Sequence, residues 1–378
     1  MNAEPQMSRY LHSRATKNKV PLSGHFELTQ NCNFSCPMCY VHESCRKEEL
    51  DTKTWLSLAE QAKNAGMLFL LLTGGEPLLR SDFEELYTAF SKLGFLISVN
   101  TNGSLAESYL PLFKKYPPFR MNISLYAADR EKYREFCGVD KFDSVVSAIE
   151  TLKKNNISVR LNSVFTKKNL SQAAKIVRFS KEHKLHLKST AYTYPQIRLG
   201  VPCGENCARL SPFEAAECEV MTDIQKFGEL AYAEKAKRLL LEDTDGTDSE
   251  DFRKVRCRAG RSSFWLTWDG KMRSCAMLPK PETEPLRFGF DAAWKELAEK
   301  TAAIRLPEEC SLCNRRKSCP VCAAMCYCET GEFSKKPGYV CEFFESLCRL
   351  SAEKSPVGAL HTSSEENTFD FEGDMYDC

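Results

Sequence analysis

Six short apolar segments alternate with amphipathic ones between residue 25 and about residue 195. The apolar segments are rich in Leu, Val, Ile and Phe, and most lack the polar alternation of a half-exposed strand. Their alternation with helix-length segments predicts parallel βα units joined by right-handed crossovers. The predicted strands are 25–30, 67–73, 96–101, 120–127, 158–165 and 186–193, and the predicted helices are 53–64, 82–93, 107–116, 142–154 and 170–184.

This repeat favours an α/β fold, a partial TIM-like barrel of six βα units whose loops at the carboxyl ends of the strands are available for chemistry. A doubly wound open sheet is the alternative, because the order of strands in a sheet cannot be read from the sequence. Asp82, Asp143 and Ser171 are the expected starts of three helices, and Gly66 and Gly94 the expected ends of two.

The chain has 378 residues, which leaves room for more than the barrel. A charged helical stretch is expected at 212–241, an acidic loop at 242–251, a β-hairpin at 263–275 with Asp-Gly in its turn, and a helix at 291–303. The predicted organisation is an N-terminal segment (1–24), a barrel core (25–195), a helical linker with the acidic loop (196–256), a Cys-rich domain (257–348) and an acidic, disordered tail (349–378).

Charge and hydropathy exclude several classes of protein. The 52 basic and 51 acidic residues leave a formal charge of +1, so no overall basic field indicates nucleic-acid binding. The N-terminal residues lack the apolar segment of a secretory signal, and the longest apolar run, 67–72, is too short to cross a bilayer. We therefore expect a soluble, cytoplasmic protein with neither nucleic acid nor membrane as a partner.

Nineteen cysteines are unusual for such a chain. In a reducing compartment, clustered thiols are more often metal ligands than disulfides. Fourteen of them form three groups, at 32–45, at 257 and 275, and at 310–348. Four others are scattered and are interpreted as small buried apolar side chains, namely Cys137, Cys203, Cys207 and Cys218.

The first group, Cys32-x3-Cys36-x2-Cys39, directly follows the first predicted strand. A structural zinc site closes with four ligands, and Cys45 or His42 is near enough in sequence to be the fourth. An iron–sulfur cluster with three protein ligands instead keeps one iron free to bind another molecule. The loop alone leaves both interpretations open.

A second motif, Gly74-Gly75-Glu76-Pro77, ends the second predicted strand. The two glycines lack side chains, so that backbone carbonyls can approach a ligand closely. Glu76 offers a carboxylate to a cationic group, and Pro77 suits the first turn of a helix. Alone, these four residues would indicate an ordinary βα turn, but they follow the cysteine loop by one βα unit.

Together the two motifs resemble the signature of the radical S-adenosylmethionine (radical SAM) superfamily over residues 25–195. That signature has an aromatic residue beside the last cysteine, and here Tyr40 follows it while Met38 precedes it. The resemblance implies a [4Fe-4S] cluster whose fourth iron is chelated by S-adenosylmethionine. The implied cluster ligands are Cys32, Cys36 and Cys39, and the implied contacts to the methionine amino group are Gly74, Gly75 and Glu76. Looser matches for ribose and carboxylate contacts are Asn100, Asn102, Ser124 and Asn162. Each of these four also fits a turn residue or a satisfied polar group.

The implied chemistry is radical chemistry. In this family a reduced cluster donates one electron to the sulfonium, a C–S bond breaks, and a 5′-deoxyadenosyl radical abstracts a hydrogen atom from the substrate. The cofactor carries that chemistry, and the protein positions and shields it. No residue of the chain stands out as a catalytic acid or base.

The distal cysteines resemble the SPASM extension of the same superfamily, which binds up to two auxiliary [4Fe-4S] clusters. Cys257-x12-Gly270-x4-Cys275 and the run Cys310-x2-Cys313-x5-Cys319 follow its pattern. After that run the chain departs from the pattern, so the next ligand is Cys322 or Cys326, and the last is Cys341 or Cys348. Zinc ribbons are the alternative interpretation, because paired CxxC units also bind zinc.

SPASM-bearing enzymes mostly modify peptides or proteins, so the resemblance implies a maturase of a ribosomally made peptide, with a peptide or protein substrate and an electron donor such as flavodoxin or ferredoxin. A formylglycine-generating enzyme like the anaerobic sulfatase maturases is the second hypothesis, although no carboxylate base stands out. A non-catalytic electron-transfer or scaffold protein is the third, and the intact Gly-Gly-Glu-Pro argues against it. The acidic tail is interpreted as a solubilising end or as an occupant of the substrate groove.

Overall fold

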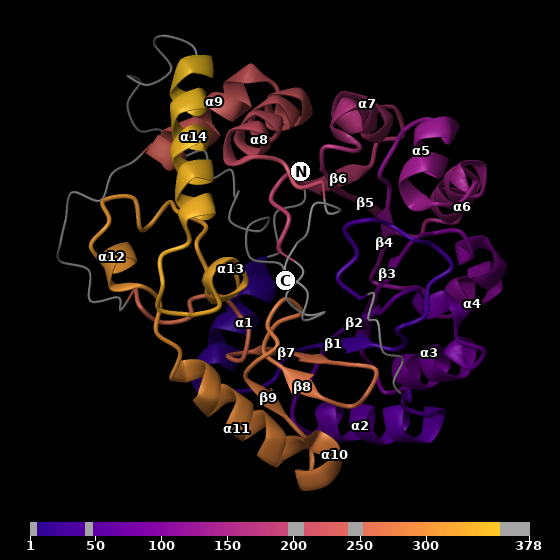
Figure 1. The fold of residues 1–378 in the computed structure, drawn as a ribbon. Helices are drawn as coiled ribbons and strands as arrows, with labels where there is room; N and C mark the ends of the chain where they lie inside the picture. The colour runs from indigo at the N-terminus through magenta and orange to yellow at the C-terminus, as the bar shows by residue number, and fades with distance from the viewer. Residues whose placement is uncertain (1–5, 42–47, 196–207, 241–251, 356–378) are drawn as a thin grey trace.

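A single curved sheet with helices on its outer side organises the molecule (Figure 1). The computed structural model describes residues 6–41, 48–195, 208–240 and 252–355. Within them, the sheet has nine strands in the order β6-β5-β4-β3-β2-β1-β7-β8-β9. Strands β1 to β6 are parallel and lie in sequence order, as in a barrel, whereas a doubly wound sheet reverses direction. The predicted partial barrel is confirmed.

All six predicted strands are present. Each overlaps the expected segment, because continuous apolar runs of this length are buried on both sides of a parallel sheet. Their bounds, followed by those of the distal strands, are β1 Ser23–Glu27, β2 Phe69–Thr73, β3 Leu96–Thr101, β4 Arg120–Ser124, β5 Val159–Val164, β6 His186–Thr190, β7 Ser263–Leu266, β8 Met272–Arg273 and β9 Glu282–Thr283.

The predicted helices are also present, and three further long or well-capped helices (α1, α5 and α14) were not predicted. No helix in the described ranges has both the length and the apolarity that crossing a membrane requires. The helices are α1 Gln6–Asn18, α2 Thr52–Asn64, α3 Phe83–Lys92, α4 Leu110–Lys115, α5 Arg130–Cys137, α6 Phe142–Lys154, α7 Ala173–Glu182, α8 Pro212–Phe227, α9 Glu229–Leu240, α10 Pro285–Phe288, α11 Phe290–Ala302, α12 Glu308–Ser311, α13 Ala323–Thr330 and α14 Gly338–Lys354, with 3-10 turns η1 Pro77–Leu79, η2 Ala106–Tyr109 and η3 Leu170–Gln172.

Several predicted boundaries need correction. The single stretch expected at 212–241 is two helices, because Gly228 has a positive φ of 85° and ends α8. Asp143 and Ser171 do not start helices, since α6 and α7 begin after other residues. Gly66 and Gly94 do follow helix ends with positive φ, as expected.

Parts of two other predictions fall outside the described residues. Residues 349–354 were predicted to belong to the disordered tail, but they are the last residues of α14. The rest of the tail from 356, and the acidic loop 242–251, lie outside the described residues, as do His42, Cys45, Cys203 and Cys207.

Strand residues divide between the two faces of the sheet. In β4, Met121 and Ile123 are fully buried in the core that the strands share with the surrounding helices. Because successive strand residues point to opposite faces, Asn122 and Ser124 lie on the inner, concave face. The register places Asn100 of β3 and Asn162 of β5 in line with Asn122 and Ser124, so these polar residues are gathered inside the partial barrel.

The sheet continues from the core into the Cys-rich region. Strand β7 pairs in parallel with β1, with Ser263 opposite Ser23, and β8 then returns antiparallel to it. Gly270 in the connecting turn has a φ of 81°, which suits the predicted Asp-Gly turn. The predicted hairpin is therefore present and forms the continuation of the barrel sheet, whereas the predicted domain boundaries stay a prediction.

Phe264 of β7 is the side chain through which the two regions share a core. It is fully buried and packs against Phe26 of β1 and against Phe290 and Trp294 of α11, with ring centroids 6.3, 5.2 and 6.1 Å away. We expect Phe264→Ala to lower the free energy of unfolding by about 3–5 kcal/mol, because it leaves a cavity at this junction. Urea unfolding followed by circular dichroism measures the effect.

Phe288→Ala is the matched control, because Phe288 is 55% exposed. Equal urea midpoints for the two variants would contradict a shared core.

Candidate functional site

The three-cysteine loop leaves β1 at the carboxyl end of the sheet. Cys32, Cys36 and Cys39 are all half-buried. Between them Phe34 is buried and packs edge-on against Tyr133 of α5, with 6.2 Å between ring centroids. The loop is therefore anchored in the core while its thiols stay near the mouth of the partial barrel.

The electrostatic surroundings of Cys32 fit a cationic centre. Burial, and after it the carboxylate of Glu76 and the thiols of Cys39 and Cys36, raise the pKa of Cys32 to about 11. The amide of Asn102 also points at its sulfur, with 3.9 Å between Nδ2 and Sγ. A bound metal centre deprotonates its thiol ligands and supplies the positive charge that this group of acidic side chains lacks.

Cys137 stands next to this loop, which no sequence pattern indicated. Its thiol is in hydrogen-bond contact with that of Cys36, and this contact, followed by burial, holds the pKa of Cys36 far above its usual range. The carbonyl of Cys137 also accepts from the backbone N–H of Ser35 at 3.0 Å. Cys137 ends α5, a helix capped by Asp129 and closed by Gly138, and that capping pair was the signal available for the helix itself.

The Gly-Gly-Glu motif is joined to the cysteine loop by backbone hydrogen bonds that extend the β1–β2 pairing. The N–H groups of Gly75 and Glu76 donate to the carbonyls of Thr29 and Asn31, each at 2.8 Å. A Cβ on Gly74 would stand 2.3 Å from the carbonyl oxygen of Thr29. Glycine is therefore needed here so that two backbones can touch, and the close approach of a ligand stays a prediction.

Glu76 is fully buried, and its carboxylate is bound by the protein itself. It accepts from Thr101 Oγ1 at 2.8 Å, from the N–H of Asn102 at 2.7 Å and from the N–H of Leu78 at 3.0 Å. Burial outweighs these hydrogen bonds and raises the pKa of Glu76 to about 7. The side chain thus ties the end of β2 to the end of β3, and Pro77 begins the 3-10 turn as predicted.

Polar side chains form a row on the inner face beside this edge. Asn100 is opposite Asn122 in the pairing of β3 and β4, and Ser124 is opposite Asn162 in that of β4 and β5. Asn122 donates to Asn100 at 2.8 Å, yet the buried Oδ1 atoms of Asn122 and Asn162 accept no hydrogen bond in the described part of the chain. Unmatched buried acceptors are costly, so hydroxyl or amino donors of a ligand fit this row.

Asn102, the remaining residue predicted to contact the cofactor, is placed differently. Its side chain binds Asn33 Oδ1 at 2.8 Å and accepts from the backbone N–H and the hydroxyl of Ser104. It bridges the β3 end to the cysteine loop. Asn122 lies two residues before Ser124 on β4, and its alternation with buried Met121 and Ile123 is the sequence signal for its inner position.

Four distal cysteines line one cavity. Cys310, Cys313, Cys319 and Cys341 face it together with aromatic and basic side chains. Burial raises the pKa of Cys319 to about 12 and that of Cys310 to about 11, and the neighbouring thiols of the same group add to both effects. The sequence did not show that these four thiols line one cavity, because Cys341 lies on α14 and the other three precede that helix.

A second distal group lies in a separate apolar cluster. Cys275 and Cys326 are buried there, and Cys257 and Cys322 pack against it. Cys348, in contrast, points its thiol at the carbonyl of Leu239, 3.8 Å away. The structure therefore brings Cys341 rather than Cys348 to the cavity, and places both Cys322 and Cys326 in the second group.

Nowhere in the described ranges do three His, Cys, Asp or Glu side chains converge as the ligands of one ion do. A zinc ion draws its thiolates to about 2.3 Å from one point, whereas a four-iron cluster stands between its thiolates and keeps them further apart.

A family comparison identifies the core. Residues 26–179 match the model described as the radical SAM superfamily. This part of the chain belongs to the radical SAM superfamily. The match contains both the three-cysteine loop and the Gly-Gly-Glu edge, so the recognition made from these motifs, and with it the expectation of an enzyme, is confirmed.

Curated relatives fall into two kinds. A probable GTP 3′,8-cyclase of Sulfurisphaera tokodaii is 35% identical over 166 residues, 42% of this chain and 53% of its own length. An AdoMet-dependent heme synthase of Methanosarcina barkeri is 26% identical over 337 residues, 83% of this chain and 94% of its own length. The chain thus spans about half the length of the cyclases that it matches, and the similarity to the heme synthase extends much further.

Solved structures share the fold through most of the chain. Streptococcus suis SuiB bound to S-adenosylmethionine has a TM-score of 0.63 at 19% identity, over 88% of this chain and 79% of its own. anSMEcpe with bound AdoMet has a TM-score of 0.65 at 18% identity, over 88% of this chain and 100% of its own. At this identity the likeness concerns the fold alone, and it reaches beyond the core into the Cys-rich region.

The buried carboxyl of Glu76 makes the stability of the cluster-free protein dependent on pH. Between pH about 4.5 and about 7 the folded protein keeps a proton that the unfolded chain has released, so this group favours folding at the acid end and loses that contribution as the pH rises through about 7. Relative to Glu76→Gln, the wild type should lose about 3 kcal/mol across this window. Urea unfolding of both proteins at several pH values measures it.

Glu84→Gln, a change on the exposed side of α3, is the control and should track the wild type at every pH. If the free-energy difference between wild type and Glu76→Gln did not vary with pH, the carboxyl would titrate normally and the effect of burial would be refuted.

Proposed function

We propose that the protein is a radical SAM enzyme that cleaves S-adenosylmethionine reductively at a [4Fe-4S] cluster held by Cys32, Cys36 and Cys39. The observation that carries the proposal is the hydrogen-bonded contact between the cysteine loop and Gly75 and Glu76, with the row of inner-face amides beside it. One molecule that binds the open iron would reach both the edge and the row.

The protein's own residues hold and shield this reaction. When bound, the cluster and S-adenosylmethionine supply one-electron chemistry that generates a carbon radical for hydrogen abstraction. In this proposal Gly74 to Glu76 present the edge for the methionine amino group, and Asn100, Ser124 and Asn162, joined by Asn122, face the ribose and carboxylate. The partial barrel around them excludes water and competing hydrogen donors.

The two distal cysteine groups are proposed as sites of auxiliary [4Fe-4S] clusters. Cys310, Cys313, Cys319 and Cys341 supply four thiols to one cavity, and Cys257, Cys275, Cys322 and Cys326 form the second group. Their separation supports two clusters. We expect an electron donor such as flavodoxin or ferredoxin to serve the enzyme.

A peptide or protein is the proposed substrate. SuiB with precursor peptide SuiA and anSMEcpe with the Cp18Cys peptide share the fold with TM-scores of 0.65, and the likeness covers 88% of this chain in both. The cyclases match over only 42% of this chain, which gives less support to a nucleotide substrate such as theirs. Maturation of a ribosomally made peptide is the favoured reaction within this class.

Formylglycine formation is kept as the second candidate because the structure contains a carboxylate at the appropriate edge. Glu219 of α8 accepts from the N–H of Ala191 at 3.0 Å, just beyond the carboxyl end of β6. Burial, and after it Asp223, raise the pKa of Glu219, which suits a general base. Mass spectrometry of candidate peptides after turnover separates a cross-link from an oxidised Ser or Cys.

Cleavage of S-adenosylmethionine tests the central proposal. Anaerobically reconstituted protein, reduced with dithionite, should release 5′-deoxyadenosine, measured by liquid chromatography. Cys36→Ala should abolish this release because it removes a cluster ligand. Cys137→Ala, the neighbouring thiol, should retain it.

Purified protein that binds zinc but no iron would refute the proposal. Loss of 5′-deoxyadenosine in Cys137→Ala, with iron content also lost, would instead make Cys137 a ligand.

Iron analysis tests the distal sites. We expect Cys341→Ala to lower bound iron by about one cluster's content, since it removes one of four thiols from a cavity. Cys348→Ala should leave iron unchanged, because its thiol faces a backbone carbonyl. The reverse result would assign the ligand to Cys348.

A further inference from the structure

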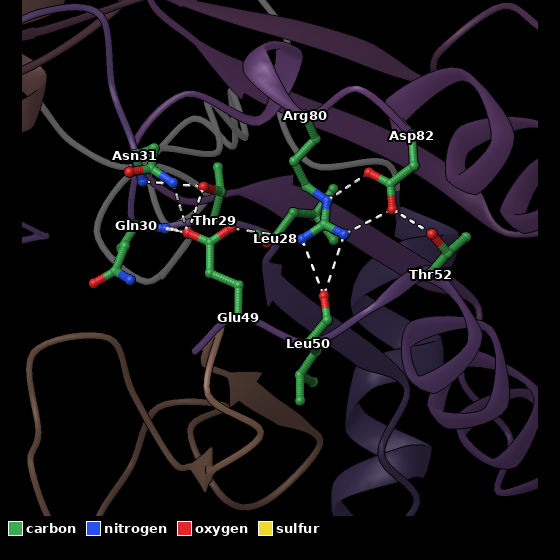
Figure 2. A network of polar contacts seen from close by, with 9 residues as sticks. All are labelled: Leu28, Thr29, Gln30, Asn31, Glu49, Leu50, Thr52, Arg80 and Asp82. Carbon is green, nitrogen blue, oxygen red and sulfur yellow. Dashed lines mark hydrogen bonds and ion pairs between the residues drawn. The ribbon is translucent and has the colours of Figure 1, made fainter. Parts of the chain in front are cut away.

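Arg80 follows the Gly-Gly-Glu-Pro turn, and its side chain is only 10% exposed. Figure 2 shows its guanidinium between Leu28, Leu50 and Asp82. Nη1 donates to the carbonyl of Leu28 at 2.7 Å, and both Nη atoms donate to that of Leu50 at 3.2 Å. Nε and Nη2 bind the Asp82 carboxylate at 2.8 and 2.7 Å, so every nitrogen of the fork has an acceptor.

The two carbonyls that Arg80 binds are the ends of one loop. Leu28 precedes the segment that contains the three cysteines, and Leu50 follows it. One planar group thus closes the loop at its base. Closing a loop of this length costs conformational entropy, and charge-assisted hydrogen bonds to both ends offset that cost.

Glu49, near the end of the same loop, binds residues at its start (Figure 2). Its Oε1 accepts from Thr29 Oγ1 at 2.7 Å, from the N–H of Gln30 at 2.8 Å and from Asn31 Nδ2 at 3.1 Å. Its Oε2 lies 3.8 Å from Arg80 Nη1. The residues that it binds lead directly into Cys32.

The same short segment also holds the Gly-Gly-Glu edge, since the carbonyls of Thr29 and Asn31 accept from Gly75 and Glu76. Arg80 and Glu49 therefore act on the one stretch of backbone that separates the proposed cluster from the proposed binding edge for methionine.

We propose that Arg80 and Glu49 form a clamp that fixes the cysteine loop relative to the Gly-Gly-Glu edge, so that Arg80 is a positioning residue for S-adenosylmethionine. The inference rests on the proposed function, because the ligand must reach the cluster and the edge at once. A displacement of about 1 Å between such parts costs on the order of a hundredfold in rate.

Arg80→Lys tests the clamp, because lysine keeps the charge but lacks the fork. In the cluster-free protein, hydrogen exchange should accelerate at the amides of residues 29–41 and at Gly75 and Glu76. In the reconstituted protein, the iron content should stay at the wild-type level, while the KM for S-adenosylmethionine in 5′-deoxyadenosine formation should rise about tenfold. The change that S-adenosylmethionine produces in the electron paramagnetic resonance signal of the reduced protein should shrink.

Glu49→Gln is the milder second variant and should shift the same readouts in the same direction. The effect of the double variant on KM, expressed as a free energy, should be smaller than the sum of the two single effects, because both changes open one clamp. Arg130→Lys is the matched control. Arg130 makes the same two-pronged contact with Asp140, at 2.9 and 2.8 Å, but its side chain is 63% exposed.

The proposal would be overturned if Arg80→Lys and Glu49→Gln lowered thermal stability but kept the wild-type KM and the wild-type spectral response. The clamp would then be a purely structural feature. If the wild type itself bound no iron or released no 5′-deoxyadenosine, the proposed function would fail. The exchange experiment on cluster-free protein would still test whether the clamp orders the loop.

Discussion

The contact between two backbones at the ends of β1 and β2 underlies the rest of the site. Parallel pairing does not stop at Glu27 and Thr73 but continues through Leu28, Thr29 and Asn31 to Gly75 and Glu76. This extension requires glycine, because any side chain at Gly74 would collide with the opposite carbonyl. The three-cysteine loop is thereby held by the scaffold where it leaves β1.

A second consequence of this pairing is the buried carboxylate of Glu76. Once the Gly-Gly-Glu edge lies against the β1 extension, the Glu76 side chain has only the end of β3 to face. Three donors satisfy it there, and Asn102 passes the connection back to Asn33 and Cys32. Three strand ends are thus bound to one another through a short polar chain in a low-dielectric setting, where such contacts are strong and a missing partner is costly.

Sequence patterns predicted the parts of this protein whose information is local. The strands could be found because each is a continuous apolar run, and the two motifs because each is contiguous. The neighbour of Cys36 could not be found, because Cys137 approaches it through the packing of α5 and not through spacing. The same reason explains why the direction of α14 was needed to see that Cys341, and not Cys348, lines the distal cavity.

The roles of Arg80 and Glu49 were equally invisible in the sequence. Each looks like an ordinary surface charge between a loop and a helix, and only the meeting of Leu28 and Leu50 gives Arg80 two carbonyls to bind. Charged residues acquire such roles through loop closure, which brings together backbone groups that no short pattern connects. Asp82 does precede α3 as expected, but its carboxylate binds Arg80 and Thr52 and makes no cap bond to the helix.

The pairing of β1 with β7 has a consequence for how the chain is made. One neighbour of β1 emerges from the ribosome soon after it, whereas the other, Ser263–Leu266, is synthesised only after most of the chain. Until then β1 presents an unpaired edge with exposed amide and carbonyl groups, the kind of edge to which other chains add. Long separation in sequence also slows the search for the pairing. Fragments that end near residue 195 would keep that edge permanently, which makes the isolated barrel half a poor candidate for expression.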